Sequence, residues 1–261
     1  MAADAAADVH LRHVGLVDMS FATEKSGNDF VSEVDLASQR AALAIIRARH
    51  PQHGILAEED DALEFGPVNS GGSEPVWIVD PLDGTTNFLH GHPMFAASVG
   101  LWAGDAFVIG AVHAAMTAES WWAADGMDAW YQGPLAPDAV RLKTSPTGSM
   151  ADALVGTGFP FKARDQIPLH LSQVDRVLRE SSGVRRTGSA ALDLCYLAQG
   201  RLDCFWERVL SVWDIAAGLR ILTEAGGVAS RVDGSPIDLE SGDVLAANGP
   251  PLHGKLRDLV S

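Results

Sequence analysis

One segment, residues 77–88, constrains this chain more than any other, because an apolar strand runs straight into a polar turn. Aspartates stand at Asp80 and Asp83, and the turn Gly84-Thr-Thr-Asn87 then opens a helix. Two carboxylates in a tight turn can bridge hard divalent cations, which prefer oxygen ligands. Free amides at the start of a helix can hold a phosphate. The segment therefore predicts phosphate-ester chemistry at the end of a strand.

The charge balance excludes some partners. The formal net charge is −15 over 261 residues, whereas nucleic acids and anionic membranes are bound through a surplus of Lys and Arg. We therefore expect neither nucleic acid nor membrane as a partner. A phosphate would need positive potential inside the acidic site, and bound metal ions can supply it.

Cysteine use and the apolar regions predict a cytoplasmic protein. The two cysteines, Cys195 and Cys204, stand among apolar residues and are expected to be buried thiols, as in a reducing compartment. The first eight residues carry acids where a signal peptide needs positive charge. The apolar region 94–116 is interrupted by Gly104-Asp105, which predicts a hairpin and not a membrane span.

The hydrophobic pattern predicts an α+β half over residues 1–140 and an α/β half over 141–261. In the first half we expect helices over 7–23 and 35–48, strands over 54–57, 76–80, 95–102, 106–114 and within 120–131, and a loop over 61–75. After a turn-rich break at 133–137 we expect strands at 154–158, 184–186, 202–206, 228 and 244–246, and helices over 169–180, 190–198, 214–225 and 252–260.

Four carboxylates are the predicted metal ligands. Glu58 and Asp80 end strands, Asp83 lies in the turn beyond, and Asp214 opens a helix. Sites in α/β sheets form at the carboxyl ends of strands, so we expect the four to converge. Two Mg²⁺ ions roughly 3.5–4 Å apart would neutralise them and hold an attacking water and a leaving oxygen in line.

The phosphate brings further negative charge, which must also be balanced. The candidates are the amides of Gly84 and Thr85, the side chain of Lys25, and a third, weaker metal. The Thr85 hydroxyl could also orient the attacking water.

Each signal alone has an ordinary structural explanation. Asp80-Pro-Leu-Asp83-Gly84 is a common turn composition, and Glu58-Glu-Asp-Asp61 suits a solvated acidic loop. Asp214 could simply cap its helix, and Lys25 could be a loop lysine. His90 and His92 have the spacing of a metal pair, but hard cations prefer oxygen. The joint occurrence of the carboxylates is what favours a site.

Taken together, these motifs resemble those of the inositol monophosphatase family. The resemblance covers residues 20–255, with the motifs in the family's order. The segments that carry it are Lys25 with Asp29 and Asp35, Ala57-Glu-Glu59, Asp80-Pro-Leu-Asp-Gly-Thr-Thr-Asn-Phe88, Gly156-Thr-Gly-Phe-Pro-Phe161, Arg185-Arg-Thr-Gly-Ser-Ala-Ala191, Val212-Trp-Asp-Ile-Ala-Ala-Gly218 and Glu224-Ala-Gly-Gly227. The segments 156–161 and 185–191 resemble the bacterial branch of the family in particular.

The resemblance implies a layered α/β/α/β/α sandwich of the inositol monophosphatase and fructose-1,6-bisphosphatase type. It also implies a homodimer that needs two to three Mg²⁺ ions and is inhibited by Li⁺. The resemblance assigns the first metal to Glu58, Asp80 and the Leu82 carbonyl, and the second to Asp80, Asp83 and Asp214, with Glu58 supporting a third. It assigns activation of the attacking water to Thr85 and Asp35. Phosphate binding falls to Gly84, Thr85 and Lys25, and substrate contacts fall to Asp83, Gly188, Ser189, Ala190 and Glu207.

The expected reaction is hydrolysis of a small phosphomonoester, with inositol 1-phosphate as the first candidate. Rival substrates are histidinol phosphate, fructose 1,6-bisphosphate and 3'-phosphoadenosine 5'-phosphate, and a non-catalytic regulatory binding protein is the rival of another class. Two departures from the family pattern bear on this choice. Ala57 stands where glycine is common, and Arg208-Val-Leu-Ser211 differs from many relatives on the leaving-group side.

Overall fold

The computed structural model of the chain describes residues 1–21, 23–26, 29–59, 74–240 and 242–261, without the side chains of 21, 24–26 and 29–31. Helical elements occur throughout this part of the chain. They are α1 (Ala2–His13), η1 (Met19–Phe21), α2 (Glu33–Arg49), α3 (Thr85–Leu89), η2 (Met150–Asp152), η3 (Arg164–Gln166), α4 (Ile167–Glu180), α5 (Ala190–Ala198), α6 (Val212–Glu224) and α7 (Pro250–Val260).

The strands in the described part of the chain form three sheets. A seven-stranded sheet has the order β3 (Gly54–Ala57), β4 (Val76–Asp83), β5 (Ala96–Ala103), β6 (Ala106–Ala114), β7 (Glu119–Ala124), β8 (Ala129–Gly133) and β9 (Ala136–Arg141). A five-stranded sheet has the order β11 (Gly183–Arg185), β10 (Leu154–Thr157), β12 (Cys204–Arg208), β14 (Asp243–Ala247) and β13 (Val228–Ser230). A small pair joins β1 (Thr23–Ser26) and β2 (Asp29–Val31).

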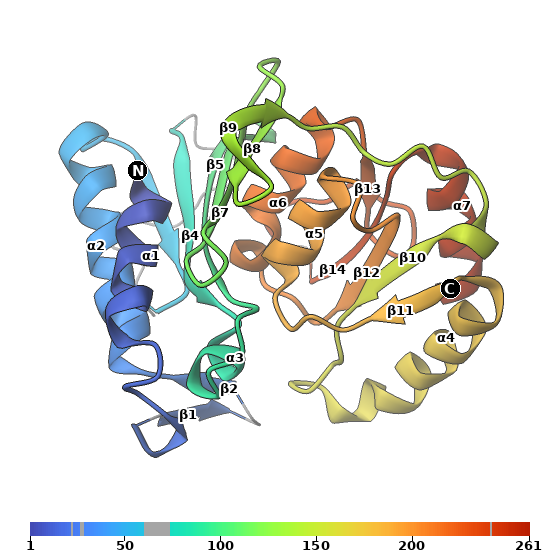
Figure 1. Cartoon of the computed structure of the whole chain (residues 1–261), viewed down its shortest axis with the longest axis horizontal. Coiled ribbons are helices and arrows are strands. Elements are labelled where there is room, and N and C mark those ends of the chain that lie inside the picture. The colour runs from blue at the N-terminus through green and yellow to red at the C-terminus, as the bar shows by residue number, and fades with distance from the viewer. Residues whose placement is uncertain (22, 27–28, 60–73, 241) are drawn as a thin grey trace.

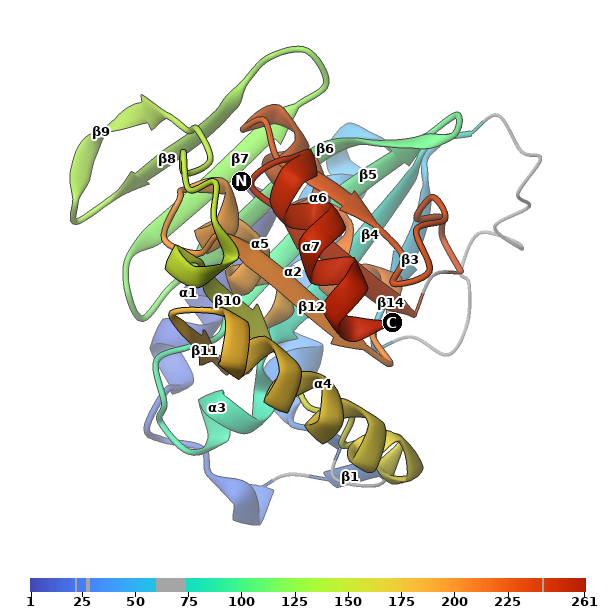
Figure 2. The same cartoon turned by 90° about the vertical axis from the view of Figure 1, so that its right-hand side faces the viewer.

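The elements stack in five layers, which confirms the expected α/β/α/β/α sandwich (Figure 1). Helices α1 and α2 cover the outer face of the seven-stranded sheet, and α5 and α6 lie between the two large sheets. Helices α4 and α7 cover the remaining face of the five-stranded sheet (Figure 2). Only β3 and β4 pair in parallel in the large sheet, whereas β10 is parallel to both of its neighbours.

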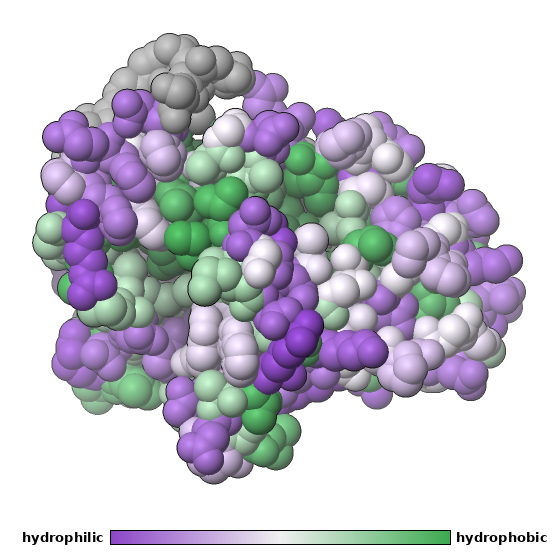
Figure 3. Space-filling model, turned by 90° about the horizontal axis from the view of Figure 1, so that it is seen from above, coloured by the Kyte–Doolittle hydropathy of each residue, from purple (hydrophilic) through white to green (hydrophobic). Residues whose placement is uncertain are grey.

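The largest core lies between the two sheets. Trp121 and Tyr131 of the first sheet and Phe205 of the second pack with α5 and α6, and all three side chains are buried. Cys195 and Cys204 are buried free thiols, as expected. Seen from above, hydrophilic residues cover both flanks of the molecule and a hydrophobic area lies between them (Figure 3). Because one core joins both halves, the division near residue 140 stays a prediction.

Some sequence-based boundaries are wrong. The first helix was expected over 7–23, but α1 ends at His13 and a separate 3₁₀ turn follows at Met19–Phe21. The break expected at 133–137 is a turn at 134–135 between β8 and β9. Strand β9 was not expected, because its residues are mostly exposed and so lack the alternating apolar pattern of a half-buried strand. The loop expected over 61–75 lies outside the described residues except for its last two positions.

Candidate active site

A β-bulge in β4 turns two carboxylates toward the same side. In a regular strand, residues three apart point to opposite faces. Here Asp80 pairs with Ser98 and Asp83 pairs with Ala96, so β4 has one extra residue between the two pairs. Pro81 fits this position because it has no N–H to leave unpaired. Asp83 was expected in a turn beyond the strand, but it belongs to β4 itself.

His10 of α1 anchors the bulge from outside the cavity. Its Nε2 donates a hydrogen bond to the Pro81 carbonyl oxygen at 2.8 Å, and its Nδ1 is buried with no partner among the described residues. The ring packs against Phe88 and Phe95, with centroids 6.1 and 5.7 Å away. Burial lowers the pKa of His10 to about 4, and the Pro81 carbonyl opposes this shift. The helix thus holds the site-bearing strand through a neutral histidine.

The low pKa of His10 predicts that the folded protein loses stability in acid. Because the pKa falls from 6.5 to about 4 on folding, the unfolded state binds the proton first as the pH drops. The His10 contribution to the free energy of unfolding should therefore fall by about 3 kcal/mol between pH 6.5 and 4. In His10→Gln the amide can still donate to Pro81 but does not titrate. Denaturant melts at matched pH values should show this difference; parallel pH profiles of the two proteins would contradict it.

Gly84 allows the chain to leave the bulge and start a helix at once. Its φ of 93° lies in the left-handed region, and an added Cβ would come within 2.9 Å of the Met94 carbonyl oxygen. Helix α3 follows directly, and the Phe88 amide donates to the Gly84 carbonyl at 3.0 Å. The amides at Gly84 and Thr85 therefore stand at a helix start, where we expected the phosphate to bind.

Asp214 reaches the site from α6, which packs within the central core against the seven-stranded sheet. We expected Asp214 to open its helix, where it could simply have been the cap. In the structure Ser211 is the N-cap residue, and Asp214 is the third residue of the helix. Its Oδ2 accepts a hydrogen bond from the Ser211 amide at 2.7 Å. One carboxylate oxygen thus fixes the first helical turn, and the other is left for a ligand.

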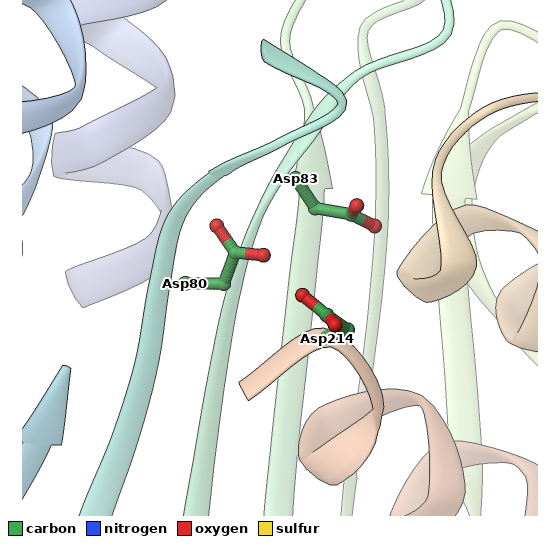
Figure 4. A group of neighbouring side chains, drawn as sticks. All are labelled: Asp80, Asp83 and Asp214. Carbon is green, nitrogen blue, oxygen red and sulfur yellow. The ribbon is translucent and has the colours of Figure 1, made fainter. Parts of the chain in front are cut away.

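Three carboxylates converge at the end of β4. One oxygen each of Asp80, Asp83 and Asp214 lies within 4.8 Å of the others. Figure 4 shows the three side chains pointing into one space, two from the strand and one from the start of α6. Glu58, directly after β3, lines the same cavity, and its amide donates to the Val79 carbonyl at 3.1 Å.

The pKa values show how strongly these acids disfavour one another's charge. Burial raises the pKa of Asp80 well above its ordinary value, and the charges of Glu58, Asp83 and Asp214 raise it further. Burial raises the pKa of Asp83 to about 6, against hydrogen bonds from Ser189 and Ala191. For Asp214, burial together with Asp83 and Glu58 raises the pKa to about 8. A bound cation would relieve this repulsion.

The donor set fits a hard divalent cation. Each of the three aspartates offers a carboxylate oxygen, and oxygen donors suit Mg²⁺, Mn²⁺ or Ca²⁺ over softer metals. His90 lines the cavity but does not belong to this group of carboxylates. The cavity measures about 510 Å³ and includes both the carboxylates and the helix start.

The opposite wall of the cavity carries Glu207, which is nearly fully buried at 8% exposure. Gly158 makes room for it, because a Cβ at that position would overlap the Glu207 carboxylate. Burial raises the pKa of Glu207 well above its ordinary value, and the guanidinium of Arg186 opposes that rise.

The structure brings most of the predicted residues together. The cavity is lined by Glu58, Asp80, Leu82, Asp83, Gly84, Thr85, Gly188, Ala190, Glu207 and Asp214. Ser189 is buried behind it and donates from Oγ to Asp83 Oδ2 at 2.6 Å. Asp35 is also buried and accepts from Thr85 Oγ1 at 2.9 Å, but it does not itself line the cavity. The side chain of Lys25 lies outside the described residues.

Sequence reasoning missed three basic residues of the cavity wall: Lys162, Arg186 and Arg208. Arg186 and Arg208 stand in segments that had been singled out, and Lys162 directly follows one, yet none of the three received a role. Nothing in their local pattern marks them, because a basic residue in a polar loop is usually exposed. Their convergence depends on the ends of β11 and β12 and on the segment after β10 meeting at one point.

Comparison with known proteins points to one family. The model of the inositol monophosphatase family matches residues 2–261. The Nus factor SuhB of Pseudomonas aeruginosa is 38% identical over 250 residues, covering 95% of this chain and 89% of that protein. The inositol-1-monophosphatase of Mesorhizobium japonicum is 41% identical over 224 residues, covering 86% and 80%.

Solved structures agree in fold over nearly the whole chain. The extragenic suppressor protein suhB of Bartonella henselae superposes with a TM-score of 0.88 at 32% identity, covering 100% of this chain and 95% of that one. The inositol monophosphatase of Anabaena sp. PCC 7120 gives 0.84 at 34%, covering 99% and 92%.

The fold and the family model thus define a protein of the phosphatase class, with a carboxylate cluster that could hold a metal ion. The chain belongs to the inositol monophosphatase family. Among the described residues, no helix is long and apolar enough to cross a membrane.

Proposed function

We propose that this protein is a Mg²⁺-dependent phosphatase that hydrolyses a small phosphomonoester, with inositol 1-phosphate as the first candidate. One observation carries the proposal: Asp80, Asp83 and Asp214 bring oxygens within 4.8 Å of one another at the mouth of a helix start. Bound Mg²⁺ would neutralise these carboxylates, polarise the phosphate and make an attacking water acidic. Glu58 and the Leu82 carbonyl complete the proposed ligand set.

The protein's own groups position the reactants. The Gly84 and Thr85 amides face the phosphate from the helix start, with Lys25 as a further candidate. Thr85 Oγ1 donates to Asp35 Oδ1 at 2.9 Å, so its lone pairs are free to accept a hydrogen bond from the attacking water. As that water gives its proton to Thr85, Thr85 can pass its own proton to the Asp35 carboxylate. Asp35 is in turn fixed by the Ser32 amide and hydroxyl at 2.8 and 2.6 Å. Water attacks phosphorus directly, and no covalent intermediate is needed.

The Thr85–Asp35 pair is tested by a double-mutant cycle. Thr85→Ala should lower kcat about a hundredfold, the range expected for losing a positioned proton acceptor. Asp35→Asn should cost a similar factor, and the double variant little more, because the two side chains act as a unit. Rates that multiply independently would contradict the pairing. Melting temperatures measured alongside separate a folding defect in Asp35→Asn from a catalytic one.

The leaving-group side supports a polyhydroxylated alcohol. Glu207 offers carboxyl oxygens to hydroxyl groups, and Gly188, Ser189 and Ala190 line or support the same wall. The same chemistry on histidinol phosphate, fructose 1,6-bisphosphate or 3'-phosphoadenosine 5'-phosphate is the nearest alternative. A non-catalytic regulatory role is disfavoured, because all four carboxylates and Thr85 are in place.

The proposed function carries further expectations about the metal ions, inhibition, oligomeric state and location of the protein. We expect two to three Mg²⁺ ions per site, inhibition by Li⁺, a homodimer and a cytoplasmic location. With a net charge of −15, we expect no nucleic acid partner.

A substrate panel tests the proposal. Phosphate release is measured from inositol 1-phosphate, histidinol phosphate, fructose 1,6-bisphosphate and 3'-phosphoadenosine 5'-phosphate, each with Mg²⁺ or with EDTA. Mg²⁺-dependent turnover of at least one ester is the expected result. Release from none of them, or release that EDTA leaves unchanged, would contradict the proposed function.

A further inference from the structure

Asn87 joins two walls of the cavity that are far apart in the sequence. It is the third residue of α3, lines the cavity and is half-buried. Its Nδ2 donates to the Met94 carbonyl oxygen at 2.6 Å and to the Thr187 carbonyl oxygen at 3.0 Å. Met94 lies between α3 and β5, whereas Thr187 lies in residues 186–189, the loop between β11 and α5. One side chain therefore ties the helix that carries the proposed phosphate-binding amides to the β11–α5 loop.

Both N–H groups of the Asn87 side chain are used in this tie. A side-chain amide has two hydrogens to donate, and here each meets a backbone carbonyl oxygen. An aspartate would place a third acceptor against these two carbonyls, and a leucine of similar size could donate to neither. The position therefore requires a short side chain with two donors.

The β11–α5 loop carries the alcohol side of the proposed site. Gly188 lines the cavity, and Ser189 holds the loop to the carboxylate cluster through its Oγ, which donates to Asp83 Oδ2 at 2.6 Å. Asn87 holds Thr187, on the other side of Gly188. The loop is thus fixed on both sides of a glycine, which would otherwise let it turn about that point.

The phosphate and alcohol sides touch through two glycines beside Asn87. Gly188 has φ of 95°, and a Cβ there would lie 2.7 Å from Asn87 Nδ2 and would overlap a guanidinium nitrogen of Arg186. A Cβ on Gly84 would lie 2.9 Å from the Met94 carbonyl oxygen and 3.2 Å from that of Gly188. Asn87 is therefore the side chain that bridges the closest approach of the two walls.

The spacing of these walls decides how an ester lies on the carboxylate cluster. The phosphate and the alcohol of one substrate molecule must reach their partners together while the phosphorus stays in line with the attacking water. A misplacement of about 1 Å can cost about a hundredfold in rate. A small ester does not reach the alcohol side, so its alignment depends on the phosphate side alone.

We propose that Asn87 is a positioning residue that holds the alcohol side of the site at a fixed distance from the phosphate side. This inference rests on the proposed function, because it concerns the same reaction. Without the two Asn87 bonds, the β11–α5 loop can shift about Gly188, whereas the Gly84 and Thr85 amides keep their place through the packing of Gly84. The loss should therefore depend on the size of the alcohol.

Two esters of different size test the role of Asn87. With saturating Mg²⁺, kcat and KM are measured for methyl phosphate and for the ester of the substrate panel that the wild-type protein turns over fastest, and Ki is measured for inorganic phosphate. In Asn87→Leu, kcat/KM for the large ester should fall about ten- to hundredfold, whereas kcat/KM for methyl phosphate and Ki for phosphate should change less than about threefold. Asn87→Ser keeps a shorter donor and should give a smaller loss for the large ester.

Asn248→Leu is the matched control for the loss of an amide tie. Asn248 Nδ2 donates to the carbonyl oxygens of Ser145 and Thr147 at 3.1 and 2.8 Å, and Asn248 does not line the cavity. Both leucine variants lose hydrogen bonds and should melt at a lower temperature than the wild-type protein. Assayed well below both melting temperatures, only Asn87→Leu should change the ratio of kcat/KM for the two esters.

The outcomes separate this inference from the proposed function. The positioning role would be overturned, while the phosphatase stands, by an unchanged kcat/KM for the large ester in both Asn87 variants, by an equal fall for both esters, or by the same change of ratio in Asn248→Leu. Absence of phosphate release by the wild-type protein from every ester would overturn the proposed function, and this inference with it.

Discussion

Asp83→Asn should lower kcat on any phosphomonoester substrate by about a thousandfold or more, because it removes a charge that a bound metal needs. Asp83 Oδ2 already accepts hydrogen bonds from Ser189 Oγ at 2.6 Å and from the Ala191 amide at 2.7 Å. The asparagine oxygen can keep both bonds, which leaves its NH₂ group facing the metal position. A donor then stands where an acceptor is required, so metal affinity and rate fall together.

The same variant separates loss of metal from loss of fold. Without metal, Asp83→Asn removes one member of a mutually repelling cluster, so the metal-free protein should melt at the wild-type temperature or above it. Asp105→Asn, at an exposed hairpin turn, is the matched control and should keep full activity. An Asp83→Asn protein that retains a tenth or more of wild-type kcat would argue against the proposed ligand.

Removing Mg²⁺ should produce the second large effect, on stability. An ion that binds only the folded state at a hundred times its Kd adds about 2.7 kcal/mol to the free energy of unfolding. For a chain of this size that corresponds to roughly 5–10 °C in Tm. Thermal melts with EDTA and with millimolar Mg²⁺ measure the shift. A Tm that is indifferent to both would count against a metal bound by these carboxylates.

The metal-free protein should also respond to pH. The pKa values of Asp83 and Asp214 rise on folding from 3.8 to about 6 and about 8. The folded state therefore holds protons that the unfolded state has released above pH 4, so these groups stabilise the fold at low pH and lose that contribution as the pH rises toward 8. Saturating Mg²⁺ should flatten this decline, and Asp83→Asn should reduce it in the absence of metal.

Much of the fold followed from local pattern. The apolar run before Asp80, the hairpin interrupted at Gly104 and the periodic helices of the second half each reflect a repeat of two or of three to four residues, which sequence displays directly. Strand β9 was missed because its exposed residues carry no such pattern. Helix α1 was misplaced because its small alanines, not a stripe of large apolar residues, form its buried face.

The sequence predicted which residues form the site, but not how the fold brings them together. The positions of the carboxylates at strand ends and at a helix start predicted their convergence, although Asp214 stands 131 positions after Asp83. The family resemblance then assigned them to two metals. The bulge that aligns Asp80 with Asp83, and the His10 bond that holds it, depend on strand register and on a contact between residues 71 positions apart. Neither property is encoded in a local pattern. The arginines of the cavity wall were missed for the same reason.

The most direct test is to titrate Mg²⁺ into EDTA-treated protein while measuring phosphate release from a phosphomonoester that it turns over, alongside the Asp83→Asn variant. We expect no release without metal, saturable activation of the wild-type protein, and an activation curve for the variant that is displaced to higher Mg²⁺ with a far lower plateau. Wild-type release that persists in EDTA, or identical curves for the two proteins, would contradict metal-dependent hydrolysis at the Asp80–Asp83–Asp214 cluster.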